Sequence, residues 1–347
     1  MAFQDRRGVS SGSGKLAARE AADTALWRMR AGAGAPLADL DAAAAADPDW
    51  AMPHVMRAGH LLALGEPAHE ADAAASLATA RTLGHSPPTR ERQHMAAVAD
   101  LLEGRWQAAC ERWGELLVAA PHDALALHWS HHWDLQRGDA LALRTRAARV
   151  VPQWTDAEDP LYPHVLARYA FALVENNLAS QAEEAARQAL AANAGVPIAF
   201  VSVAQAMQVQ GRFDEGVAWL RQHQDAWADE RNLLAPHLWW HLALFRLEAM
   251  DLAGTQRLID GHLSQDASQA LPAHRIDAAA LLWRLHLLGV DMRDRFASLA
   301  QAWPGIETLQ TSVTFGLLVR NMHRWAAHLM VLSVFLHMAR VFYHGAY

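Results

Sequence analysis

A short turn signal recurs along this chain at a nearly constant interval, and this periodicity constrains the fold more than any other feature. Neighbouring signals are separated by about 34 residues, the period of a tetratricopeptide repeat, or by slightly more. The stretches between them are rich in alanine, leucine, arginine, glutamate and glutamine, which favour helix. The seven sites are Leu64-Gly65, Glu103-Gly104, Arg137-Gly138, Asn176-Asn177, Gln210-Gly211, Met250-Asp251 and Leu288-Gly289. The sequence therefore predicts about six or seven helix pairs.

A repeated helix pair cannot bury its apolar face alone, so neighbouring pairs must stack to form a core. Pro121, Pro163 and Pro197 open successive units. Proline is tolerated at such helix starts because its missing N–H would have no partner there. The predicted fold class is all-α, with a tetratricopeptide-like helical-repeat solenoid over residues 16–304. We expect its groove to bind a protein or peptide.

Composition and charge limit the classes of function and the cellular compartments that the sequence allows. The net charge of −7 argues against nucleic acid, whose phosphates require a basic face. The single cysteine, Cys110, excludes an internal disulfide and is expected to be a buried core residue. Residues 1–15 contain a Gly/Ser run but lack the apolar core of a signal peptide. We therefore predict a mobile leader and a cytoplasmic body.

Twenty histidines raise the hypothesis of a metal site in the body. His237 and His241 are four residues apart on a predicted helix, a spacing that places two imidazoles on one face. His128, His131 and His132 form a second cluster. Neither group has a carboxylate or cysteine at ligand spacing. We expect core or groove-lining imidazoles, and retain His237 and His241 as weak groove candidates.

Several motifs of the body resemble the tetratricopeptide-repeat protein 38 family over about residues 15–303. The motifs are PTRERQH at 88–94, GRWQAACERW at 104–113, PHDALAL at 121–127, ADPD at 46–49, VPQW at 151–154 and WHLAL at 240–244. The resemblance implies the repeat fold but no reaction. Where the family usually has a histidine pair and an asparagine, this chain has Val201, Gln205 and Leu238. A polar pocket in the concave face would be largely lost, which favours a non-enzymatic scaffold.

The amino-acid composition of the sequence changes from Gly305 onward. Residues 325–343 contain no Asp or Glu, and Arg340 is their one fixed charge. A membrane helix needs ~20 predominantly apolar residues. The sequence therefore predicts a membrane-type helix at about 320–343 within a segment 305–347, and places the join between Trp303 and about Thr308. The chain would be membrane-associated if this helix inserts.

Two histidines of this segment have a spacing suited to haem. His323 and His337 are 14 residues apart, which leaves them within about 40° of each other on a helix and ~21 Å apart along its axis. Haem iron accepts neutral imidazole nitrogen as an axial ligand. Histidines within a membrane are costly and usually functional. One helix could thus offer one ligand to each of two stacked haems.

The segment resembles the second transmembrane helix of cytochrome b. The matching runs are VTFG at 313–316, RNMHRWAAH at 320–328, FLHMARVF at 335–342 and GAY at 345–347. By this resemblance His323 and His337 are haem ligands, and Arg320 and Arg340 are partners of the haem propionates. In cytochrome b the opposite ligands come from another helix. We therefore expect haem b only if a partner supplies them.

Four interpretations of the two-part chain stay open at this point. Recombination or sequence assembly could have joined two genes into a chimera, or a natural fusion could anchor the body to a membrane. A partner subunit could complete a haem-binding fragment, or the segment could be a buried soluble helix. The sequence favours a non-enzymatic scaffold fused to a truncated cytochrome b-like helix. The alternative is a membrane-bound electron-transfer component of a quinol-oxidising cytochrome b complex.

Overall fold

The computed structural model describes residues 3–5, 7–32, 34–83, 87–229, 231–263 and 271–301. These residues are almost entirely helical, which confirms the predicted all-α class. One short antiparallel ribbon precedes the helices, in which β1 (Phe3–Gln4) pairs with β2 (Ser10–Ser11). The chain divides into two compact units. The first unit comprises Met1–Gln265 and Ala270–Leu281, and the second comprises Asp266–Gln269 and Leu282–Tyr347.

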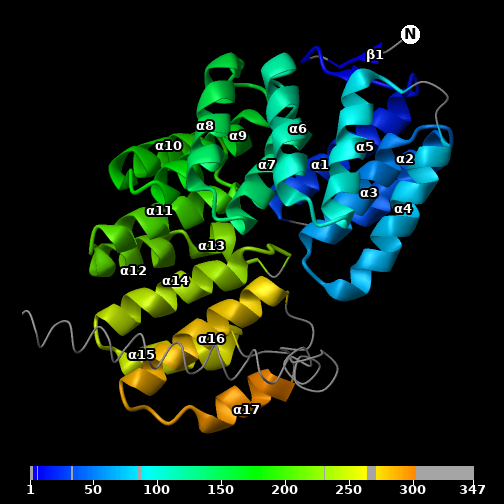
Figure 1. Cartoon of the computed structure of the whole chain (residues 1–347). Helices are drawn as coiled ribbons and strands as arrows, with labels where there is room; N and C mark the ends of the chain where they lie inside the picture. The colour runs from blue at the N-terminus through cyan, green and yellow to red at the C-terminus, as the bar shows by residue number, and fades with distance from the viewer. Residues whose placement is uncertain are drawn as a thin grey trace, which may run out of the picture. The chain divides into compact units, whose positions relative to one another are not determined.

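The helices follow one another with short connections (Figure 1). The first nine are α1 (Leu16–Ala31), α2 (Pro36–Ala46), α3 (Met52–Ala63), α4 (Glu70–Thr82), α5 (Thr89–Leu102), α6 (Trp106–Ala119), α7 (Ala124–Gln136), α8 (Ala140–Val150) and α9 (Tyr162–Glu175). The others are α10 (Ala179–Ala192), α11 (Pro197–Val209), α12 (Phe213–Gln222), α13 (Gln224–Trp227), α14 (Ala235–Glu248), α15 (Leu252–Leu258), α16 (Pro272–Leu287) and α17 (Arg293–Gln301). Short 3-10 turns lie at Pro67–His69 and Val151–Gln153, and a π-helical turn at Ile259–Leu263 extends α15.

All seven predicted turns are confirmed, and each contains one residue in the left-handed region. These residues are Gly65, Gly104, Gly138, Asn177, Gly211, Met250 and Gly289, with φ between 59° and 85°. They recur at nearly equal intervals along the chain, as the turn signals predict. A left-handed residue ends a helix because the chain can no longer continue the helical hydrogen bonds. Each turn therefore separates the two helices of a pair, from α3 and α4 through α16 and α17.

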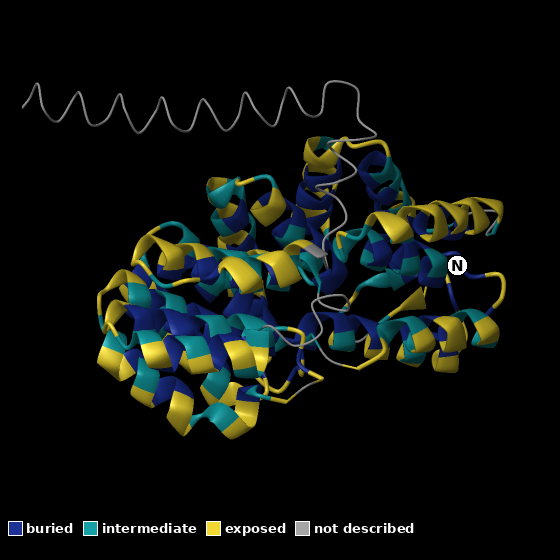
Figure 2. Ribbon diagram, turned by 90° about the horizontal axis from the view of Figure 1, so that it is seen from below, coloured by how far each residue is buried: buried dark blue, intermediate teal, exposed yellow. Residues whose placement is uncertain are grey.

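Helix pairs of the first unit pack against their neighbours along the chain. In Figure 1, α9 lies beside α10 and α11, and α5 lies beside α6. Their facing sides are apolar: Trp113, Trp129, Leu117 and Leu125 are buried almost completely. Figure 2 shows exposed residues along the outer sides of these helices and buried residues along the inner sides. Cys110 belongs to this core, as predicted.

The first unit departs from a solenoid in which each pair contacts only its neighbours. Arg30 Nη1 at the end of α1 donates to the carbonyl oxygen of Ala124 at 2.8 Å. The amide of Leu233 donates to the carbonyl oxygen of Gly32 at 2.7 Å. Arg275 Nη2 in α16 lies 2.5 Å from Glu66 Oε1. The end of α1 therefore contacts both α7 and the segment before α14, and α16 contacts the segment before α4. Elements that are far apart in the sequence thus pack together in the first unit.

The described residues of the N-terminal segment, which the sequence predicts to be a mobile leader, make several contacts with the helical body. Arg7 makes a two-point ion pair with Asp159, at 2.6 and 3.1 Å. Ser13 Oγ donates to Asp47 Oδ2 at 2.5 Å, and the amide of Gly12 donates to an oxygen of Glu91 at 2.6 Å. The Gly/Ser run supplies amides and hydroxyls to carboxylates that the helices bury. Buried carboxylates need such donors, and this requirement orders the segment.

A buried network of hydrogen bonds involves two residues of the PTRERQH motif, Arg90 and His94. Trp113 Nε1 donates to His94 Nδ1 at 3.1 Å, and His94 Nε2 lies 3.0 Å from Asp123 Oδ2. Arg90 binds the same carboxylate at 2.6 and 3.2 Å, while Asp123 also caps α7. Burial would raise the pKa of Asp123, but Arg90 and His94 outweigh it and hold the pKa below its usual range. These motif residues therefore have a structural role.

Within the described ranges, no helix combines the length and the apolar character that crossing a bilayer requires. The predicted membrane-type helix at 320–343 and the predicted join after Trp303 lie outside the described residues.

Candidate functional site

In the described part of the chain, histidine gathers on the first helices of the pairs. The first helices α3, α5, α7, α9, α14 and α16 contain it and α11 does not, whereas among the described second helices only the π-helical turn that extends α15 carries one, His262. The histidines of the first helices are His54, His60, His94, His128, His131, His132, His164, His237, His241, His274 and His286. The first helices therefore carry most of the chemistry that a site in the body could use.

The densest polar group lies where α1, α7 and α9 meet. Arg30 of α1, His131 of α7 and His164 of α9 are at most 3% exposed, and Arg168 of α9 is 7% exposed. Arg168 Nη2 donates to His128 Nδ1 at 2.6 Å, and Arg30 is held by its bond to α7. We call Arg30, His128, His131, His164 and Arg168 the Arg/His cluster. Sequence analysis singled out only its α7 members.

Burial determines the charges within the Arg/His cluster. It lowers the pKa of Arg168 to about 10, and it lowers the pKa of Arg30, with a further contribution from Arg168. A pKa of about 10 leaves Arg168 charged at neutral pH, and we treat Arg30 as charged because guanidinium groups keep their proton in proteins. Burial, followed by the two arginines, lowers the pKa of His131 and brings the pKa of His164 to about 3. The cluster therefore combines two cations with neutral imidazoles.

Several buried nitrogens of the cluster have no hydrogen-bond partner among the described residues. They are Nε and Nη2 of Arg30 and both ring nitrogens of His131 and of His164. Such groups are rare in folded proteins, because each loses its water without gaining a replacement bond. Within the described residues, no polar group satisfies these nitrogens.

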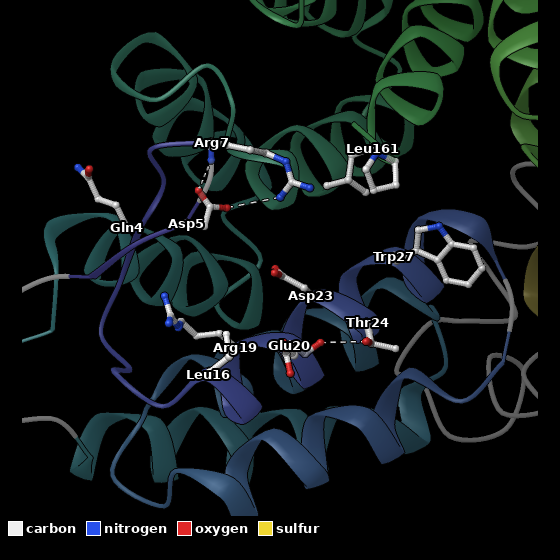
Figure 3. Close-up of a pocket in the computed structure, with 11 residues that line it drawn as sticks. Gln4, Asp5, Arg7, Leu16, Arg19, Glu20, Asp23, Thr24, Trp27 and Leu161 are labelled. Atoms are coloured by element: carbon white, nitrogen blue, oxygen red, sulfur yellow. Dashed lines mark hydrogen bonds and ion pairs between the residues drawn. The ribbon is translucent and has the colours of Figure 1, made fainter. Parts of the chain in front are cut away.

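A pocket of about 530 Å³ lies beside Trp27, and none of its described lining residues belongs to the cluster. It lies between the N-terminal segment, α1 and the residues before α9, and Figure 3 shows Trp27 and Leu161 at one end and Gln4 at the other. Trp27 also contacts the ring of His164 edge-on, with centroids 6.5 Å apart. Leu161 comes one turn before His164 on the chain. Trp27 therefore links the pocket to the cluster.

The predicted pair His237 and His241 comes together on α14, with ring centroids 4.8 Å apart. Each imidazole is already engaged through Nδ1: His237 with Asp277 Oδ2 at 2.7 Å, and His241 with Gln208 Oε1 at 3.1 Å. Burial, followed by His237, lowers the pKa of His241. In the described part of the chain, no group of three or more His, Cys, Asp or Glu is arranged for a metal ion. Asp277 follows His237 by about one repeat. A comparison of residues one repeat apart could therefore have identified Asp277 as the partner of His237.

At the three positions that differ from the resembled family, the side chains are either buried in the apolar core or hydrogen-bonded to another side chain. Val201 and Leu238 are buried core residues. Gln205 Nε2 donates to Glu175 Oε1 at 2.6 Å. This part of the first helices therefore offers less unpaired polar surface than the Arg/His cluster.

The predicted haem ligands His323 and His337, and their companions Arg320 and Arg340, lie outside the described residues. Comparison with known proteins is informative here. Residues 287–347 match the family described as cytochrome b/b6/petB. The resemblance of this segment to cytochrome b is thereby confirmed. The matched range begins before α17, a helix that the sequence analysis assigned to the body.

Individual relatives give the same result. Over 97 residues the chain is 33% identical to cytochrome b6 of Heliomicrobium gestii, covering 25% of this chain and 46% of that protein. Over 46 residues it is 50% identical to the menaquinol:cytochrome c reductase cytochrome b subunit of Bacillus subtilis (strain 168), covering 13% and 20%. The chain spans less than half the length of these curated relatives. The resemblance of residues 15–303 to the tetratricopeptide-repeat protein 38 family stays a prediction.

Proposed function

We propose that this chain is an electron-transfer component of the cytochrome b type, attached to a membrane through its C-terminal segment. The match of residues 287–347 to the cytochrome b/b6/petB family carries this proposal. The histidine spacing supports it independently, because on a helix His323 and His337 would share one face at a separation of ~21 Å. The relative from Bacillus subtilis is a menaquinol:cytochrome c reductase subunit, so a quinol is the proposed electron donor.

The donor set suits haem b, which supplies one-electron chemistry when bound. His323 and His337 would each give one imidazole nitrogen to an iron, and Arg320 and Arg340 would pair with propionates. The opposite ligands would come from a partner subunit, since one helix offers one ligand to each haem. The apolar run at 325–343 would place these histidines in the bilayer, where protein surroundings set the reduction potential.

Haem content of membranes that contain the full chain and its partner tests this proposal. The wild type should show the reduced-minus-oxidised absorption of haem b. His323→Ala and His337→Ala should each lower haem per chain by about half, because each histidine serves one haem. His328→Ala is the matched control, since this imidazole is not at a ligand position. Haem-free wild type, or equal haem in all variants, would contradict the proposal.

The proposal also requires that one gene encode both parts. Genomic sequencing across codons 295–320 should give one uninterrupted reading frame. Two separate genes at that point would overturn the proposal and make the chain a chimera.

A scaffold is the second candidate function, for the body. The seven regularly spaced left-handed turns favour it, because repeated helix pairs present extended binding surfaces. A scaffold predicts a stoichiometric protein partner that co-purifies with the wild type and equally with a His323→Ala/His337→Ala double variant. Recovery of both proteins without a partner would exclude this function.

A further inference from the structure

We propose that the Arg/His cluster is a binding site for a small oxyanion, a phosphate or carboxylate group carried by a small molecule. The site is independent of haem and lies entirely in the first unit. Arg30 and Arg168 are both buried and act on the same imidazoles. Two buried cations without a counter-charge are costly to fold, and a bound anion would remove that cost.

Asp159 does not balance the charge of the cluster. Asp159 is the acidic group that acts on Arg30, and its effect is the smallest of those that shift the pKa of Arg30. Both Asp159 oxygens already bind Arg7, at 2.6 and 3.1 Å. Arg168 uses one Nη2 bond on His128, a neutral imidazole. Among the described residues, positive charge is therefore not neutralised at the cluster.

The unpartnered nitrogens have the chemistry that an oxyanion needs. Arg30 offers Nε and Nη2, the edge of a guanidinium that binds two oxygens of one carboxylate or phosphate. A neutral imidazole donates from one ring nitrogen, so His131 and His164 can each add one donor. The same two arginines disfavour a metal cation, whose charge they would repel.

The edge of the cluster is partly exposed to solvent. His128 lies at this edge and is partly exposed, as are His132 on the same helix and His60 on α3. The pocket beside Trp27 and Leu161 has about 530 Å³, within the ~300–1,000 Å³ of small-molecule sites. Trp27 touches both the pocket and His164. The ligand would place its anionic group at the arginines and its body against Trp27.

Thermal unfolding of the full chain with inorganic phosphate in one arm and benzoate in the other tests the site. Sodium chloride at equal ionic strength is the reference. A ligand that binds the folded state raises Tm in a saturable way. We expect such a rise with at least one of the two anions. A rise with phosphate alone, or benzoate alone, identifies which oxyanion the site prefers.

Single-residue variants show whether the anion that raises Tm binds at the Arg/His cluster. Arg168→Gln and His164→Phe should each weaken anion binding at least tenfold, read from the concentration that gives half of the Tm rise. Arg187→Gln is the matched control, because Arg187 lies on the exposed side of α10 and pairs with Glu183. It should respond as the wild type does. No anion-dependent rise in the wild type, or equal responses in His164→Phe and Arg187→Gln, would overturn the proposal.

Discussion

Arg168 Nη2 lies 2.6 Å from His128 Nδ1, so a charged guanidinium donates to an imidazole nitrogen that must lack a proton. Burial, followed by Arg168 and Arg30, lowers the pKa of His128 and keeps this nitrogen free to accept. The contact joins α9 to α7, two first helices from neighbouring pairs. Neutral histidine is thus a structural requirement of the first unit, and it makes stability dependent on pH.

The first prediction concerns acid sensitivity. Burial lowers the pKa of His60 and of His132 to about 4 and that of His164 to about 3. In the unfolded chain these groups protonate at about pH 6.5, so the unfolded state binds more protons between the two values. The free energy of unfolding should therefore fall as pH drops from about 6.5 to about 4. Urea unfolding across this range measures the slope.

Single variants assign that slope to the buried imidazoles. His164→Phe removes one proton-binding group from the unfolded state and should make the dependence on pH shallower. His286→Gln changes an exposed histidine and should leave the slope unchanged. A wild type equally stable at pH 7 and at about pH 4.5 would show that these histidines are not kept neutral by the fold.

The second prediction concerns the buried ion pair of Arg90 and Asp123. Asp123→Asn should lower the free energy of unfolding by ~3–5 kcal/mol, because a buried arginine loses its charge partner. Urea unfolding at neutral pH measures this loss. Asp41→Asn is the matched control at the exposed pair with Arg57, where a change of at most ~1 kcal/mol is expected. Equal effects at the two sites would contradict the structural role given to Asp123.

The third prediction concerns the left-handed turns. Gly138 has φ of 70°, with open space around its Cα, so Gly138→Ala tests backbone strain alone. It should destabilise the chain by ~1 kcal/mol. Met250 has φ of 59° and is exposed, so Met250→Gly should relieve strain and stabilise by up to ~1 kcal/mol. The midpoints of urea unfolding should therefore move in opposite directions, and a shift of both in one direction would be inconsistent with the turns described.

Part of this structure could be predicted from sequence because it is periodic. Glycine and asparagine mark the turns locally, so their spacing indicates the helix pairs without any knowledge of packing. The same period places His128 opposite Arg168 and His237 opposite Asp277, with about one repeat between the members of each pair. Such pairs could have been found by comparing residues one repeat apart.

The rest could not be predicted because it depends on long-range contacts that no local pattern encodes. Arg30 of α1 meets α7, and Arg275 of α16 meets Glu66 near the start of the chain. These contacts bring α1 to the Arg/His cluster and close the first unit. The docked N-terminal segment was missed for the same reason, since the carboxylates that hold it come from three distant places on the chain.

The last prediction separates stability from binding at Arg30. A buried, unbalanced arginine is costly, and replacing even a paired buried charge together with its partner by apolar side chains is often neutral or stabilising by ~1–4 kcal/mol. Arg30→Met should therefore unfold at higher urea than the wild type in the absence of anions, and should lose the Tm rise that phosphate or benzoate gives. Arg146→Met is the contrasting control: it removes a partner of buried Asp134, so it should destabilise the chain and leave anion binding intact. If Arg30→Met is less stable than the wild type, Arg30 contributes to the fold instead of being retained at a cost for a ligand.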